Sequence, residues 1–179
     1  MSEISDLELR YPIGKFKLEG EVTQEMIRSF ICDLEEAPAK LYEAVKGLSD
    51  EQLNTPYRPG GWKVKQVVHH LPDSHLNAYI RFKLTLTEDE PLVKTYQEAK
   101  WAELPDSINT PVSVSLDLFK NLHIRWFALL KSMTSEDFRR TFRHPENGIT
   151  RLDRTLAVYA WHGKHHVAHI TTFRKRMCW

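Results

Sequence analysis

Four of the nine histidines in this 179-residue chain fall within eight consecutive positions: His162, His165, His166 and His169. Residues four apart on a helix lie on successive turns with Cβ atoms about 5–6 Å apart, close enough to share a metal ion. Two such pairs exist, and His162 with His166 lies nearer to the centre of the apolar stripe of this segment than His165 with His169. Buried neutral imidazoles need polar partners, and a metal ion supplies them. The spacing therefore predicts a divalent metal site that includes His162 and His166.

A third metal ligand is expected from another helix, because two imidazoles alone bind a metal weakly. A second segment of helical periodicity carries His69, His70 and His75. Periodicity favours His75, near the middle of the apolar face, whereas His70 lies roughly 110° away at 100° per residue. Pro72 lies inside the same segment and is expected to kink the helix, so the phase of its first turns is uncertain. Spacing alone leaves the third ligand open.

The other polar residues are less informative. Outside the metal site, His75 is expected to be a core or supporting histidine, and His69, His123 and His144 to be surface or structural. Three residues close to the candidate ligands could orient imidazoles or move protons: Asp73, His75 and His169. For Asp73, a solvated position on a helix face is an equal alternative. Four loop residues could line a pocket: Tyr57, Arg58, Tyr96 and Trp101. No general acid or base is assigned.

Helical periodicity predicts four long helices, over residues 23–46, 64–86, 115–133 and 150–177. Pro38 should bend or split the first helix. No segment has a convincing strand pattern. Four long helices with connections of varied length indicate an all-α protein, a four-helix bundle.

The connections carry several local signals. Residues 87–112 contain three prolines and no clear period, so we expect a long loop that acts as a lid, a binding loop or a packing arm. Ser49 with Gln52 resembles a capping box for a short extra turn. Thr150 with Asp153 is predicted to cap the last long helix.

Composition excludes several classes of protein. Residues 1–179 are expected to form a single domain that begins with an irregular arm of about twenty residues. Lys and Arg number 25 against 24 Asp and Glu, which leaves no basic surface for nucleic acid. No apolar run is long enough for a membrane helix, and the N-terminus has no secretory signal. Cys32 and Cys178 are expected to be free thiols, so we expect a cytoplasmic protein.

Six stretches of the sequence, in order along nearly the whole chain, resemble one family. They are residues 11–14 (YPIG), 56–62 (PYRPGGW), 67–71 (VVHHL), 73–75 (DSH), 77–83 (NAYIRFK) and 161–170 (WHGKHHVAHI). The chain resembles the DinB/YfiT-like metal-dependent hydrolases, a family that includes bacillithiol S-transferases. The resemblance implies a four-helix bundle, often a homodimer, that binds one zinc or nickel ion, zinc before nickel. It also implies His70, His162 and His166 as the metal ligands.

Three function classes follow from such a site. Three protein imidazoles leave a coordination position open, as in catalytic zinc sites. A metal-activated water there would make the protein a hydrolase of small molecules. The alternative is an S-transferase that conjugates a low-molecular-weight thiol such as bacillithiol to an electrophile, because a coordinated thiol loses its proton. A metal-stapled bundle without catalysis would instead need a fourth protein ligand, His75 or His169.

Overall fold

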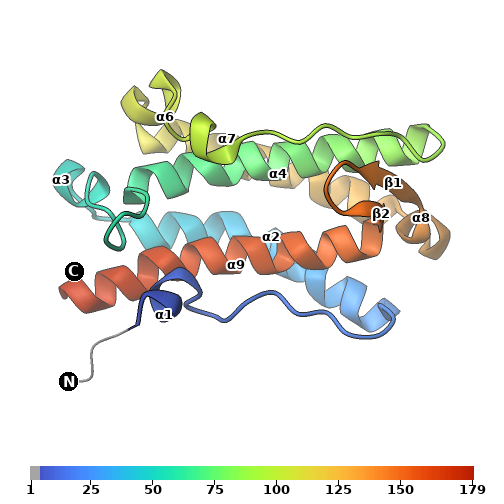
Figure 1. The fold of residues 1–179 in the computed structure, drawn as a ribbon, viewed down its shortest axis with the longest axis horizontal. Coiled ribbons are helices and arrows are strands. Elements are labelled where there is room, and N and C mark those ends of the chain that lie inside the picture. The colour runs from blue at the N-terminus through green and yellow to red at the C-terminus, as the bar shows by residue number, and fades with distance from the viewer. Residues whose placement is uncertain (1–4) are drawn as a thin grey trace.

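The computed structural model describes residues 5–179, which form a four-helix bundle (Figure 1). Its long helices are α2 (Gln24–Val45), α4 (Val64–Thr87), α7 (Val112–Ser132) and α9 (Leu152–Met177). These are the four predicted helices, although α7 begins at Val112 rather than near Ser115. Both α2 and α4 continue through the prolines inside them, so Pro38 does not split α2. The predicted all-α class and bundle architecture are confirmed.

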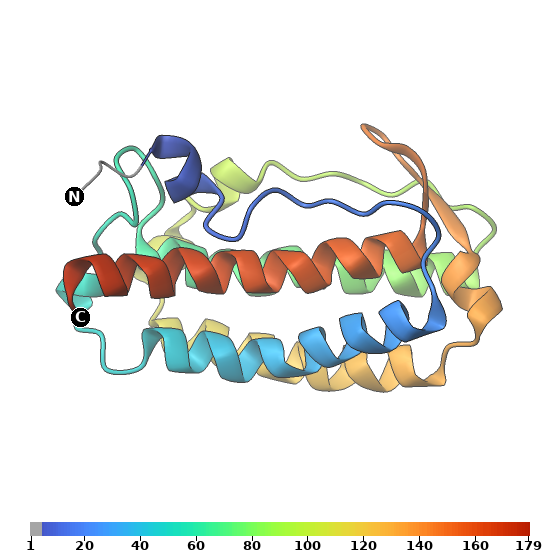
Figure 2. The ribbon, with the colours of Figure 1, turned by 90° about the horizontal axis from the view of Figure 1, so that it is seen from below.

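The long helices are not arranged in simple chain order. Helix α2 packs against α7 and α9, and α4 packs against the same two, so α2 and α4 lie on one diagonal of the bundle. Figures 1 and 2 show that α4 and α7 run in the same direction, as do α2 and α9. Segment 88–111 therefore returns along the length of the bundle before α7 begins. None of the helices in residues 5–179 is long and apolar enough to span a membrane.

Short helices occupy the connections and the N-terminal arm. Ser49 and Gln52 form the predicted capping box at the start of α3: the Ser49 hydroxyl accepts from the Gln52 N–H at 3.2 Å, and the Gln52 side chain accepts from the Ser49 N–H at 2.9 Å. The expected long loop between α4 and α7 contains two helical turns. The short helices are α1 (Asp6–Arg10), α3 (Asp50–Leu53), α5 (Glu98–Trp101), α6 (Pro105–Asn109) and α8 (Ser135–Arg139).

A β-hairpin precedes α9, which corrects the expectation that the chain has no strands. Strands β1 (Thr141–His144) and β2 (Gly148–Arg151) pair antiparallel, with His144 opposite Gly148. Four residues are too few to show a period of two, so the sequence pattern could not reveal these strands. The predicted cap at Thr150 is also wrong, because Thr150 lies in β2 and α9 begins after Arg151 without a side-chain cap.

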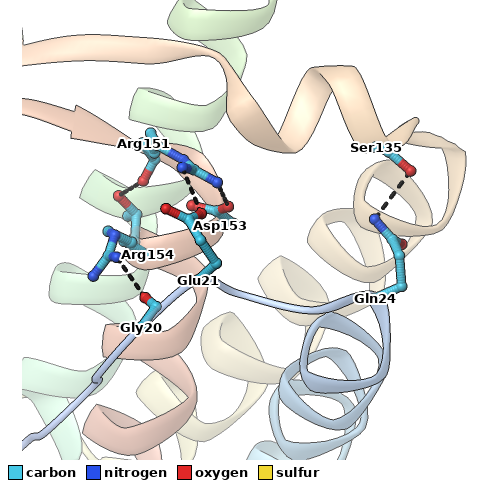
Figure 3. Close-up of polar contacts among 8 residues, drawn as sticks. Gly20, Glu21, Gln24, Ser135, Arg151, Asp153 and Arg154 are labelled. Atoms are coloured by element: carbon cyan, nitrogen blue, oxygen red, sulfur yellow. Dashed lines mark hydrogen bonds and ion pairs between the residues drawn. The ribbon is translucent and has the colours of Figure 1, made fainter.

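The N-terminal arm is held along α9 by polar contacts (Figure 3). Arg154 donates to the carbonyl of Gly20 at 2.7 Å, and Arg151 forms ion pairs with Glu21 at 2.9 Å and with the buried Asp153 at 2.5 Å. These contacts fix the end of the arm where α9 starts. Because the arm runs beside α9 in both views, it covers a face of this helix that would otherwise meet solvent.

Two apolar clusters fill the bundle, one toward each end. The first includes Trp126 and Leu156, and the second includes Leu41 and Ile170. Along α4 and α9, the residues between the two clusters are mostly polar, and several of them are histidines. The middle of the core therefore contains a layer of histidines, here called the histidine layer. Its members come from α4, α7 and α9: His70, His75, His123, His162, His165, His166 and His169.

Candidate metal centre

Three imidazoles from two helices converge in this layer. His70 comes from α4, and His162 and His166 lie one turn apart on α9. One ring nitrogen of each lies within 4.8 Å of those of the other two. The Nε2 atoms of His70 and His162 are 3.3 Å apart, and the ring centroids of His162 and His166 are 4.4 Å apart. The structure thus brings together the three residues that the family resemblance implied.

His70 and His75 both point into the bundle, although the helical wheel favoured His75. Every residue of α4 from 66 to 72 is buried, so this part of the helix has no solvent face. The reason is segment 88–111, whose helices α5 and α6 pack against α4 from outside the bundle. Periodicity assumes one buried face per helix, and that assumption fails where a second layer covers the other face.

The three imidazoles fit a metal ion in geometry and in charge. Two nitrogens bound to one tetrahedral zinc at 2.0–2.1 Å would lie about 3.3 Å apart, which is the separation of the His70 and His162 Nε2 atoms. Burial lowers the pKa of His70 to about 4. Burial, reinforced by the neighbouring imidazoles, lowers the pKa values of His162 and His166 well below the ordinary value. All three rings are therefore neutral at pH 7, the form that binds a metal.

The triad faces a cavity of about 400 Å³, a size suited to a small molecule. Within residues 5–179 the cluster includes no fourth histidine, cysteine or carboxylate, so any ion it held would keep an open position toward this cavity. Tyr96 and Tyr159 line the wall, and burial raises the pKa of both hydroxyls. Both hydroxyls therefore stay protonated near neutral pH and can donate hydrogen bonds to a bound ligand.

The loop residues proposed for the pocket divide into two groups. Tyr96 lines the cavity. Trp101 packs against the Tyr96 ring, with centroids 4.6 Å apart. Tyr57 instead stacks on His169 at 4.3 Å, and Arg58 lies 3.7 Å from Asp6. Two of the four residues therefore support other parts of the structure and do not contact the triad.

The remaining polar residues agree with the expectations in part. Of the two roles expected for His69, surface or structural, the structure shows the second: His69 is buried, and its Nδ1 lies 2.7 Å from the Ser115 hydroxyl. His123 of α7 is also buried, and its Nε2 lies 3.0 Å from Nδ1 of His75. His144 lines the cavity from β1, a position that the missed hairpin concealed. Asp73 does not line the cavity, and burial raises its pKa to about 6.

Comparison with known proteins places the chain in a family. A model of the DinB superfamily matches residues 33–170. Proteins of Bacillus cereus (strain 03BB102) and Bacillus thuringiensis subsp. konkukian (strain 97-27), both named putative metal-dependent hydrolases, are 55% identical to it over 172 residues, which cover 96% of this chain and 99% of theirs. The structure of YfiT from Bacillus subtilis, described as a probable metal-dependent hydrolase with an unusual four-helix bundle topology, matches with a TM-score of 0.93 and 50% identity over 96% of this chain and 99% of that one. The chain belongs to the DinB superfamily.

Proposed function

We propose that this protein is a metal-dependent hydrolase of small molecules, in which His70, His162 and His166 hold one divalent ion. The observation that carries the proposal is the convergence of three neutral imidazoles on the wall of an open cavity. Zinc is the first candidate and nickel the second, because imidazole nitrogen suits both ions. The names of the two similar Bacillus proteins support the same class of activity.

The side chains around the triad have separate tasks in this proposal. When bound, the ion supplies Lewis acidity, which lowers the pKa of a coordinated water. Trp62 packs against the His70 ring with centroids 4.8 Å apart, so it restricts that imidazole and shields it from solvent. Tyr96 and Tyr159 offer hydroxyl donors to a substrate oxygen on the cavity wall.

Metal content of single variants tests the ligand set. We expect His166→Ala to lose stoichiometric zinc, because only two imidazoles of the triad would remain. His144→Ala is the matched control: His144 lines the same cavity, but its Nδ1 accepts from the backbone N–H groups of Glu146 and Asn147. The control should bind zinc as the unchanged protein does. Full zinc occupancy of His166→Ala, measured by elemental analysis after dialysis, would show that the ligand set is wrong.

Turnover assays separate hydrolysis from thiol transfer, which would use the same open position. The zinc-loaded protein is given activated esters and amides in buffer alone, and in parallel a low-molecular-weight thiol with a model electrophile. Hydrolysis that needs no thiol and disappears in His166→Ala supports the proposal. Product that forms only with the thiol would assign the protein to the S-transferases instead.

A further inference from the structure

A chain of hydrogen bonds leads from one ligand of the triad across the bundle. The Nδ1 atom of His162 lies 3.2 Å from Nε2 of His75, and Nδ1 of His75 lies 3.0 Å from Nε2 of His123. Nδ1 of His123 lies 2.6 Å from the carbonyl oxygen of Leu34 on α2. His75 is fully buried and His123 is 3% exposed, so water does not compete for these bonds. All four long helices contribute to the chain.

The carbonyl oxygen of Leu34, at the end of this series of hydrogen bonds, determines the direction of every bond in the series. A carbonyl oxygen can only accept, so His123 must carry its proton on Nδ1 and donate it to Leu34. A neutral His123 then accepts at Nε2, which makes His75 the donor at Nδ1 and an acceptor at its own Nε2. His162 must therefore donate from Nδ1, which leaves the lone pair on Nε2. That is the nitrogen that faces His70 at 3.3 Å.

A second and separate chain acts on the other α9 ligand in the same way. Nδ1 of His166 lies 3.4 Å from Nδ1 of His169, and Nε2 of His169 lies 2.9 Å from the carbonyl oxygen of Arg10 at the end of α1. The Arg10 carbonyl accepts, so a neutral His169 donates from Nε2 and accepts at Nδ1. His166 then carries its proton on Nδ1 and has its lone pair on Nε2. The N-terminal arm thus supplies the acceptor that sets this direction.

The contrast with His69 shows what a carbonyl at the end of the chain contributes. His69 is buried in the same helix, but its Nδ1 meets the Ser115 hydroxyl, which can donate or accept. The contact with Ser115 alone therefore does not determine the His69 tautomer. Both chains from the triad end on backbone carbonyls, so the direction of each is fixed by the fold.

We propose that His75, His123 and His169 are positioning residues that hold His162 and His166 in the Nδ1–H tautomer, so that both present Nε2 to the metal ion. The identity of the metal ligands rests on the proposed function. The tautomers of His162 and His166 do not, because the hydrogen bonds that set them are present without metal. Partners of this kind orient ligand imidazoles, and their loss typically lowers metal affinity 10–100-fold. The bundle thereby sets the direction of two ligands from residues that do not reach the ion.

Nitrogen-15 NMR of the histidine rings tests the proposal directly, in metal-free protein at neutral pH and again with zinc. We expect the rings of His162 and His166 to be protonated at Nδ1 in both states. In His75→Phe, the His162 signal should shift toward a mixture of tautomers, and zinc affinity measured by competition with a chelator should fall about 10–100-fold. In His169→Phe the same changes should appear at His166, which tests the second chain even if the first variant does not fold.

Two further variants separate hydrogen bonding from packing. His75→Gln should recover affinity relative to His75→Phe, because the amide offers an acceptor to His162 and a donor to His123. Phe119→Leu should leave zinc affinity and tautomers unchanged, since Phe119 only packs against the rings of His75 and His123, at 4.9 and 4.2 Å.

The outcomes distinguish the positioning proposal from the proposed function. Protonation of His162 at Nε2 in the metal-free protein, or unchanged zinc affinity in both His75→Phe and His169→Phe, would overturn the positioning role. Failure of the unchanged protein to bind zinc or nickel would instead refute the proposed function, and the tautomers measured without metal would still decide the positioning role.

Discussion

Acid should destabilise the metal-free protein through its buried histidines, and His123 gives the clearest case. This side chain is 3% exposed, and burial lowers its pKa to about 4. In the unfolded chain a histidine has a pKa of about 6.5. At a pH between these two pKa values, the unfolded state binds a proton at His123 and the folded state does not. The free energy of unfolding therefore falls as the pH falls. From pH 7 to pH 5 this one group should cost about 2 kcal/mol of unfolding free energy.

Urea unfolding of the metal-free protein in a chelator, at pH 7, 6 and 5, measures this cost. The unchanged protein should lose stability steadily across the series. His123→Phe should start lower at pH 7, because His75 loses its partner, yet it should lose about 2 kcal/mol less between pH 7 and pH 5. Phe119→Leu is the control: it perturbs the same packing and retains His123, so its pH dependence should match that of the unchanged protein.

The informative quantity is the difference between the two proteins in how much unfolding free energy they lose from pH 7 to pH 5, and not the stability of either at one pH. If His123→Phe and the unchanged protein lose the same free energy between pH 7 and pH 5, then His123 is not held neutral by its burial. Such a result would also remove the reason for treating Nε2 of His123 as the acceptor of its bond with His75.

Three further predictions concern single positions. Gly163→Ala should raise stability by about 0.5–1 kcal/mol in thermal unfolding, because the added Cβ would meet its nearest neighbour at 3.5 Å, an ordinary contact. Arg151→Met should lower the free energy of unfolding by about 2 kcal/mol, because the carboxylate of Asp153 is 2% exposed and loses its partner. This loss is smaller than that for a fully buried ion pair, since Arg151 is partly exposed. Adding Asp153→Asn should recover most of that loss. Tyr96→Phe should lower kcat/KM about tenfold with zinc content unchanged, because it removes a donor from the cavity wall.

The long helices could be predicted from sequence because each has one clear apolar stripe over many turns. Two histidines of α9, His162 and His166, could also be chosen by phase. His165 and His169 are buried as well, because the N-terminal arm contacts both of them. Phase failed on α4, where it favoured His75 over His70. Both are buried there: each contacts His162 of α9. Segment 88–111 covers the outer face of the helix, so burial does not single out one face. Only the family resemblance selected His70, since no local pattern shows that a distant segment folds back over a helix.

Long-range partners account for the other failures. His123 belongs to no motif, and its role depends on His75 and on a carbonyl of α2 that is 89 residues away in sequence. His144 reaches the cavity only because β1 and β2 pair. A backbone carbonyl as a partner leaves no trace in residue types, so spacing could not have revealed either hydrogen-bonded chain.

The same buried histidines pack the middle of the bundle and set the geometry of the candidate site. An apolar layer at the middle of the core would bury the same volume without the acid sensitivity argued for His123. The layer instead holds neutral imidazoles whose bonds end on the carbonyls of Leu34 and Arg10, one in the bundle and one in the N-terminal arm. These acceptors lie on elements that contribute no member of the triad. Movement of α2 or of the arm would therefore change which ring nitrogen of His162 or His166 carries the proton, while the triad itself stays in place.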